Sequence, residues 1–238
     1  MTDIRIVPAA DFGGACLEAL QEAGARSRSI TVGLPTGSTP IALYAEMASV
    51  AAAGNLDISG WRPFAIDEYG GARLHPCSNR RFFERHWESI SGAPEVEQFD
   101  PEAPDLEAEA RRMREAIDAA GGLDIALLGI GLNGHVAFNE PGSAAGSTVR
   151  RVDLSEASRE SARACWGDET PAWGLTLGLR ELFSAETVII MAHGAAKADI
   201  VARAIDGPET VHVPASLSRR SARAIWVLDE AAASRLKR

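Results

Sequence analysis

The sequence predicts a single-domain α/β protein with a Rossmann-like, mainly parallel sheet and helices on both faces. Short apolar segments typical of buried strands recur along the whole chain, and segments with helical patterns separate them. This alternation is characteristic of parallel sheets covered by helices. The 238 residues also contain no internal repeat and no linker rich in proline, glycine and serine. We therefore expect one domain spanning residues 1–238.

Each expected element has its own local signal. The expected strands are apolar runs at residues 30–34, 64–66, 124–130, 188–191 and 224–228. The expected helices lie between them, at residues 39–50, 78–87, 106–120 and 195–205. Thr39 is expected to cap the first helix, with Pro40 in its first turn, and Ser78 to cap the second. The third has the alanine content and charge density of a helix with one exposed face.

The composition limits the classes of function. The apolar fraction of 46% and the charged fraction of 24% are those of an ordinary globular protein. The net charge of −9, without a dense basic segment, argues against general nucleic-acid binding. No apolar run is long enough to span a membrane, and the first residues do not resemble a signal peptide.

The chain has three cysteines, Cys16, Cys77 and Cys165. Their odd number and scattered spacing predict no disulfide framework, and neither they nor the histidines show a metal-binding spacing. We therefore expect a protein of the reducing cytoplasm without a bound metal. The patterns are equally compatible with a monomer and with a homo-oligomer.

A turn after the first expected strand is a candidate anion site. At Gly37, Ser38 and Thr39, backbone N–H groups, hydroxyls and a helix start converge. The spacing is neither a Walker loop nor a dinucleotide fingerprint, and an ordinary strand-to-helix turn is an equal alternative. Lys197, one of only two lysines, lies near another helix start. The helix dipole disfavours an ammonium there unless an anion is present, so Lys197 is a candidate for a phosphate contact, and a solvated lysine is the alternative.

Two segments carry groups suited to acid–base chemistry. Asp67 and Glu68 directly follow the second expected strand, where one of them is a candidate general base and a simple turn residue is the alternative. His135 and Glu140 follow the third expected strand, with Asn133 two residues before the histidine. A histidine held by a carboxylate transfers protons near neutral pH, whereas a structural histidine held by backbone is the alternative. Carboxyl ends of parallel strands share one edge of the sheet, so these groups are expected to meet.

Residues 142–170 form the least regular part of the sequence and are rich in small and polar side chains. A mobile lid over the site and an ordinary surface connection explain this composition equally well. One of its arginines, Arg150, Arg151, Arg159 or Arg163, is a candidate for a bidentate phosphate clamp, and most of them are expected to be surface residues.

In the order in which they occur along the chain, these segments resemble the glucosamine-6-phosphate deaminase family, which is also called the glucosamine-6-phosphate isomerase family. The most specific match runs from Leu128 to Pro141 and contains Asn-Gly-His and Phe-Asn-Glu-Pro. The related 6-phosphogluconolactonases resemble the chain in the glycine loop and the Gly-His step, but typically lack Phe-Asn-Glu-Pro. The other matching segments are residues 33–40, 67–69, 75–78, 194–197, 213–217 and 229–233.

The resemblance implies conversion of glucosamine 6-phosphate and water to fructose 6-phosphate and ammonia, without a cofactor. It implies that His135 assists ring opening, that Asp67 moves the C2 proton toward C1, and that Glu140 supports His135. Asn133 belongs to the same catalytic set, and Glu68 is expected to have a supporting role in substrate binding.

The resemblance also implies the phosphate site. Gly37, Ser38, Thr39 and Lys197 would hold the phosphate, joined by an arginine of residues 142–170. Arg163 is the first choice for this arginine and Arg159 the second.

Two departures from the family pattern matter. Asn133 stands where some members carry aspartate, which removes a charge beside His135. Val152 stands where allosteric members carry a basic residue, and the chain ends soon after Glu230, so activation by N-acetylglucosamine 6-phosphate is not expected. The alternative functions are a 6-phosphogluconolactonase, a galactosamine-6-phosphate deaminase or, from another class, a sugar-phosphate sensor domain.

Overall fold

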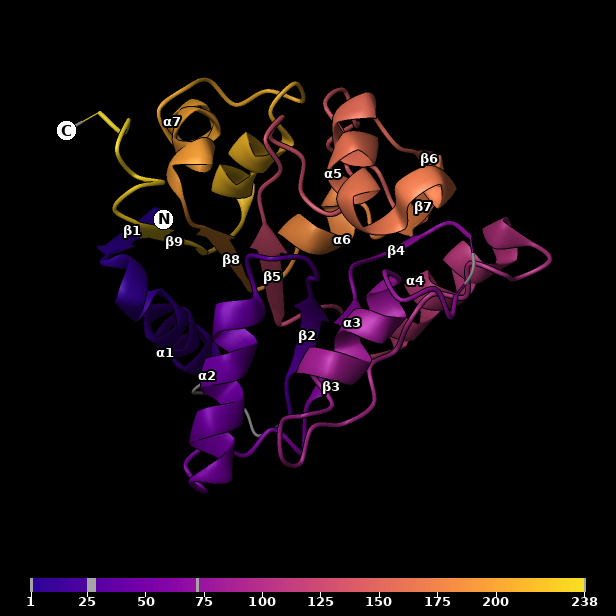
Figure 1. Cartoon of the computed structure of the whole chain (residues 1–238), viewed down its shortest axis with the longest axis horizontal. Helices are drawn as coiled ribbons and strands as arrows, with labels where there is room; N and C mark the ends of the chain where they lie inside the picture. Colours follow the sequence, from indigo (N-terminus) through magenta and orange to yellow (C-terminus); the bar gives the residue numbers. More distant parts are fainter. Residues whose placement is uncertain (1, 25–28, 72, 238) are drawn as a thin grey trace.

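The computed structural model describes residues 2–24, 29–71 and 73–237. A parallel sheet forms its centre, built from β1 (Thr2–Val7), β2 (Thr31–Leu34), β3 (Arg62–Ala65), β5 (Ile125–Gly129), β8 (Thr187–Ala192) and β9 (Ala224–Asp229). The strand order is β1-β9-β8-β5-β2-β3, and every neighbouring pair is parallel (Figure 1). The predicted α/β class with a mainly parallel sheet is confirmed.

Helices pack on both faces of this sheet. The α-helices are α1 (Phe12–Gly24), α2 (Ile41–Ala52), α3 (Asn79–His86), α4 (Leu106–Ala119), α5 (Glu156–Trp166), α6 (Leu179–Phe183) and α7 (Ala198–Ile205). Short 3-10 segments are η1 (Ala9–Asp11), η2 (Gly167–Glu169), η3 (Ala195–Lys197) and η4 (Pro214–Arg220). Within the described ranges, no helix is long and apolar enough to cross a membrane.

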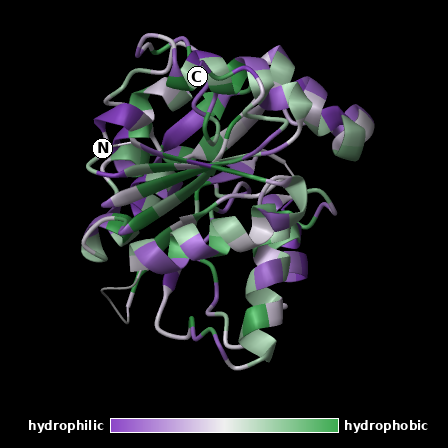
Figure 2. Ribbon diagram, turned by 90° about the vertical axis from the view of Figure 1, so that its left-hand side faces the viewer, coloured by the Kyte–Doolittle hydropathy of each residue, from purple (hydrophilic) through white to green (hydrophobic). Residues whose placement is uncertain are grey.

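The core is divided by the sheet into two apolar layers. In β5, Ile125 and Leu127 pack with α1, α2 and α3, whereas Ala126 and Leu128 pack with α4, α6 and α7. Side chains of a strand point alternately to its two faces, so a strand covered on both sides must be apolar at every position. Figure 2 shows the resulting band of hydrophobic strands between the helices. Uninterrupted apolar runs were therefore a reliable signal for these central strands.

A second, antiparallel sheet accounts for strands that the patterns did not predict. It contains β4 (Asp67–Tyr69), β7 (Trp173–Thr176) and β6 (Arg150–Asp153), with β7 in the middle. These strands are short, and β4 and β6 are largely polar, so only their pairing with β7 defines them. Residues 142–170 include β6 and α5 and are therefore more regular than their composition suggests.

The expected strands and helices are all present, with small differences at their ends. Ser78 caps α3, because its hydroxyl accepts a hydrogen bond from the N–H of Arg81 at 3.3 Å. The prediction that Thr39 caps α2 is wrong: Pro40 occupies the cap position, and it has no side-chain group that could accept a hydrogen bond. Thr39 instead lines a cavity.

The prediction of no disulfide is also wrong. Cys77 and Cys165 are disulfide-bonded, with their Cα atoms 5.9 Å apart, and they are 88 positions apart in sequence. The fold brings the end of α5 against the loop before α3, where the Trp166 ring stacks on His75 with centroids 4.0 Å apart. Cys16 is free and buried in α1. A single long-range pair gives no local spacing pattern, which is why the sequence did not reveal it.

Candidate active site

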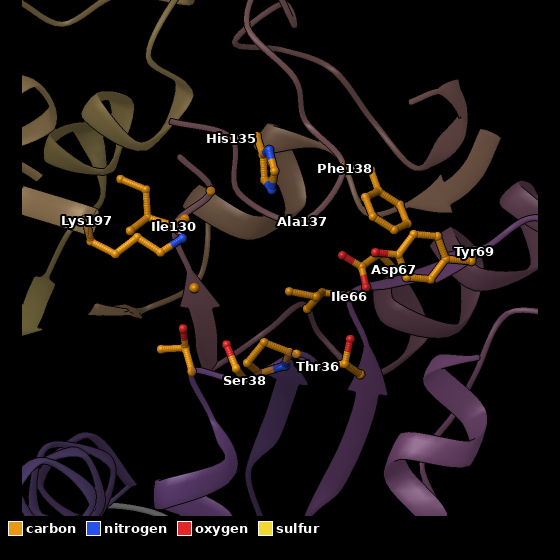
Figure 3. A pocket seen from close by; sticks show the side chains of 15 residues that line it. Thr36, Ser38, Ile66, Asp67, Tyr69, Ile130, His135, Ala137, Phe138 and Lys197 are labelled. Carbon is orange, nitrogen blue, oxygen red and sulfur yellow. Dashed lines mark hydrogen bonds between the residues drawn. The ribbon is translucent and has the colours of Figure 1, made fainter. Parts of the chain in front are cut away.

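The candidate site is a cavity of about 200 Å³ at the carboxyl ends of β2, β3 and β5 (Figure 3). Parallel strands bring their carboxyl ends to one edge, so loops distant in sequence meet there. Its lining residues are Pro35, Thr36, Gly37, Ser38, Thr39, Ile66, Asp67, Tyr69, Gly129, Ile130, Gly131, His135, Ala137, Phe138 and Lys197. The cavity thus combines the candidate anion loop with both candidate acid–base groups.

The loop after β2 and Lys197 line the same cavity. Gly37 has a φ of +91°, a conformation that side-chain-bearing residues rarely adopt, and this turns the loop toward the start of α2. Lys197 ends η3, and its Nζ donates a hydrogen bond of 2.7 Å to the carbonyl of Ile130. Burial lowers the pKa of this ammonium. An anion in the cavity would offset that burial, as expected for a phosphate site.

Asp67 and Glu68 begin β4 but point in different directions. Asp67 lines the cavity and is 8% exposed. Burial, together with the neighbouring carboxylate of Glu68, raises the pKa of Asp67 to about 7, although a hydrogen bond from Asn79 opposes the change. A carboxylate with a pKa near neutrality is suited to take and return a proton at physiological pH.

Glu68 lies outside the cavity lining and anchors α3. Its carboxylate accepts hydrogen bonds from the backbone N–H groups of Tyr69, Asn79 and Arg80 at 2.8, 2.9 and 3.0 Å. Glu68 was expected to support substrate binding, and this position allows it to do so only indirectly. A supporting role, through the placement of β4 against α3, remains the prediction for this residue.

His135 is held by the carboxylate of Glu140. His135 Nδ1 lies 3.4 Å from Glu140 Oε2, and Asn133 Nδ2 donates to the same oxygen at 2.8 Å. The backbone N–H of His135 in turn donates to Asn133 Oδ1 at 3.1 Å. The ring lies against Gly131, where an added Cβ would come within 2.3 Å of it, so the glycine is required for this close approach.

Glu140 also contacts α5. Ser158 Oγ donates to Glu140 Oε1 at 2.5 Å and lies 3.3 Å from His135 Nδ1, and the N–H of Ser155 reaches Oε1 at 3.4 Å. Burial alone would raise the pKa of Glu140, but the hydrogen bond and charge of His135, with Ser158 and Asn133, outweigh it and lower the pKa to about 2. The ionised carboxylate favours a proton on Nδ1, which leaves Nε2 as the nitrogen available to a ligand.

Comparison with known proteins identifies the family. Residues 8–226 match the family described as glucosamine-6-phosphate isomerases/6-phosphogluconolactonase. The chain belongs to this family. The family resemblance expected from the sequence motifs is confirmed.

Individual relatives are similar over most of their length. Glucosamine-6-phosphate deaminase of Hahella chejuensis is 37% identical over 226 residues, covering 93% of this chain and 85% of that protein. The deaminase of Streptomyces coelicolor is 36% identical and covers 99% of this chain and 93% of its own.

Solved structures of the family share the fold. A monomeric glucosamine-6-phosphate deaminase superposes with a TM-score of 0.93 at 26% identity, covering 98% of this chain and 99% of that one. A 6-phosphogluconolactonase from Thermotoga maritima has a TM-score of 0.77 at 22% identity, covering 96% and 100%, and shows the same fold.

The two candidate arginines of this family member do not line the cavity. Arg163 lies on α5 and pairs with Glu160 and, at 3.4 Å, with Glu156. Arg159 lies 3.6 Å from Glu156, and its buried Nε has no hydrogen-bond partner in the part of the chain that the structure describes. A phosphate contact from either arginine remains a prediction. The described residues contain no group of three or more side chains able to hold a metal.

Several residues that shape the site were missed by sequence reasoning. Ser158 and Asn79 contact the acid–base groups, while Tyr69 and Phe138 pack with their ring centroids 4.8 Å apart at the cavity wall. Thr36 lies in the same loop as the predicted anion residues and lines the cavity. Ser158 and Asn79 reach the site from helices that sequence patterns cannot place beside it.

Proposed function

We propose that this protein is a glucosamine-6-phosphate deaminase, which converts glucosamine 6-phosphate and water to fructose 6-phosphate and ammonia in amino-sugar catabolism. One observation carries the proposal: Asp67 and His135, which Glu140 holds, line the same cavity as the anion loop and Lys197. The curated relatives named above carry the same activity in their names. We place the reaction in the cytoplasm, where phosphorylated sugars are metabolised.

The cavity suits the first step, opening of the sugar ring. Phosphate bound near Ser38 and Lys197 would fix the substrate at one end, so that the other end faces the acid–base groups. His135 Nε2 takes the proton of the anomeric hydroxyl and delivers it to the ring oxygen, which gives the open-chain aldehyde. Glu140 stabilises the positive charge on the His135 imidazole while its Nε2 holds the proton.

Asp67 then performs the isomerisation. As the C1 aldehyde oxygen takes up a proton, the Asp67 carboxylate takes the proton from C2, which forms an enol-amine between C1 and C2. The proton then returns to C1 while the amine nitrogen releases one proton to water. The product is an imine at C2, and addition of water there followed by loss of ammonia gives fructose 6-phosphate. Because these steps only move protons and water, they need no redox cofactor.

The test is an assay of the purified protein with glucosamine 6-phosphate, following ammonia and fructose 6-phosphate in equal amounts. Asp67→Asn should abolish turnover but retain sugar-phosphate binding, while Asp118→Asn on the exposed side of α4 should behave as the wild type. Absence of turnover in folded wild-type protein would refute the proposal.

Two other substrates belong in the same experiment. Faster conversion of galactosamine 6-phosphate would change the sugar specificity but retain the reaction. Faster hydrolysis of 6-phosphogluconolactone would favour the second branch of the family, with which the fold is shared.

A further inference from the structure

Asn79, the first residue of α3, contacts the candidate base Asp67 from outside the cavity. Its side-chain Nδ2 donates a hydrogen bond of 2.6 Å to Asp67 Oδ1 and another of 3.0 Å to the backbone carbonyl of Asp67. Asn79 is 3% exposed and is not part of the cavity lining. One amide group therefore holds both the side chain and the main chain of the same aspartate.

This double contact restricts the Asp67 carboxylate to one orientation. With Oδ1 and the carbonyl both bound to one rigid amide, rotation about the Cα–Cβ bond would break a buried hydrogen bond. Among the described residues, Asp67 Oδ2 has no hydrogen-bond partner, and Figure 3 shows the carboxylate at the cavity wall. The free oxygen is therefore the one presented to a ligand.

The Asn79 side chain is not needed to form α3. Ser78 caps this helix, and the Glu68 carboxylate already accepts the N–H groups of Asn79 and Arg80 at its first turn. The side chain of Asn79 is therefore available for Asp67. Its place on a short helix fixed at both Ser78 and Glu68 makes it a rigid donor.

The charged surroundings of Asp67 explain why a donor matters there. The carboxylate of Glu68 on the same strand disfavours a second negative charge on Asp67, whereas His135 and Lys197 line the cavity that Asp67 faces. Burial also disfavours the ionised form. A neutral amide N–H favours ionised Asp67 without adding a charge that would bind the substrate phosphate in the wrong place.

We propose that Asn79 is a positioning residue for proton transfer, which fixes the Asp67 carboxylate so that Oδ2 faces C2 of the substrate. This inference rests on the proposed function, because it assigns Asp67 as the base. Asn79 touches no substrate atom and acts only through Asp67.

The test compares wild-type protein with Asn79→Ala, the nearly isosteric Asn79→Asp, and Phe83→Leu as a control in the buried face of the same helix. Loss of a hydrogen bond to a charged group predicts a kcat lower by about 10- to 100-fold in Asn79→Ala, with KM changed by about 3-fold or less. The acidic limb of the kcat/KM profile should move to higher pH, and further in Asn79→Asp. Phe83→Leu should lower Tm without moving this limb.

The outcomes separate this inference from the proposed function. Wild-type turnover combined with an unmoved acidic limb in both Asn79 variants would overturn the positioning role alone. Lack of wild-type turnover would overturn the deaminase assignment, and with it a role in that reaction. Carboxyl NMR titration of Asp67 in wild type and Asn79→Ala reports the same contact without turnover: an unchanged titration midpoint would contradict the inference, and a raised midpoint would support it.

Discussion

The Cys77–Cys165 disulfide gives the sharpest stability prediction, since it closes a long loop. Reduction, or the substitution Cys165→Ser, removes the cross-link between the loop before α3 and the end of α5. The two cysteines are 88 positions apart. The chain-entropy relation for a loop of this length gives about 4–5 kcal/mol of lost stability at 25 °C. For a protein of this size, that loss corresponds to a Tm lower by about 10–15 °C.

Thermal unfolding followed by circular dichroism, with and without dithiothreitol, measures the change in Tm. The double variant Cys77→Ser/Cys165→Ser is the matched control, because its Tm should not respond to the reductant. Thiol titration of the denatured, unreduced chain should find one thiol, that of Cys16. Three thiols in that titration, or an unchanged Tm on reduction of the wild type, would refute the reasoning.

Three further predictions concern the cavity. Asp67→Asn should stabilise the fold above pH 7, because keeping a carboxylate ionised when burial has raised its pKa from 3.8 to about 7 costs about 4 kcal/mol. This gain in the free energy of unfolding should shrink as the pH falls from 7 toward 4, because Asp67 of the wild type then becomes protonated in both the folded and the unfolded protein. Urea unfolding at pH 4.5 and 8 measures the gain, and equal gains at the two pH values would contradict the prediction. Ser158→Ala should lower kcat about 10-fold by removing a donor to Glu140; steady-state kinetics with an unchanged kcat would show that Ser158 is dispensable. Lys197→Met should raise KM for glucosamine 6-phosphate about 10- to 100-fold, and an equal effect on unphosphorylated glucosamine would argue against a phosphate contact.

The apolar patterns predicted five of the six strands of the central sheet, because these five are covered on both faces. They missed the edge strand β1, where Ile4 and Ile6 are exposed. A strand such as β5 must be hydrophobic at each position, and the residues of Ile125–Gly129 themselves show this apolar pattern. The same local reasoning failed for β4 and β6, whose polar side chains carry no such requirement. Their strand conformation follows from pairing with β7.

The residues of the candidate site also fall into those whose position the sequence predicted and those whose position it did not. Asp67 and His135 were predicted from their places at strand ends, and both line the cavity. Glu68 was expected near the substrate but anchors α3, because neighbouring side chains of a strand point to opposite faces. Spacing along the chain alone does not tell which of two adjacent acids faces a cavity.

By itself, the sequence determined the α/β class, the family and the chemical groups at the strand ends, since each depends on residues close together in the chain. Only the tertiary structure decided which groups support them: Asn79 behind Asp67, Ser158 against Glu140, and the Cys77–Cys165 bond. These contacts join segments separated by many residues. Their geometry depends on how helices pack beside the sheet, so no local pattern encodes it.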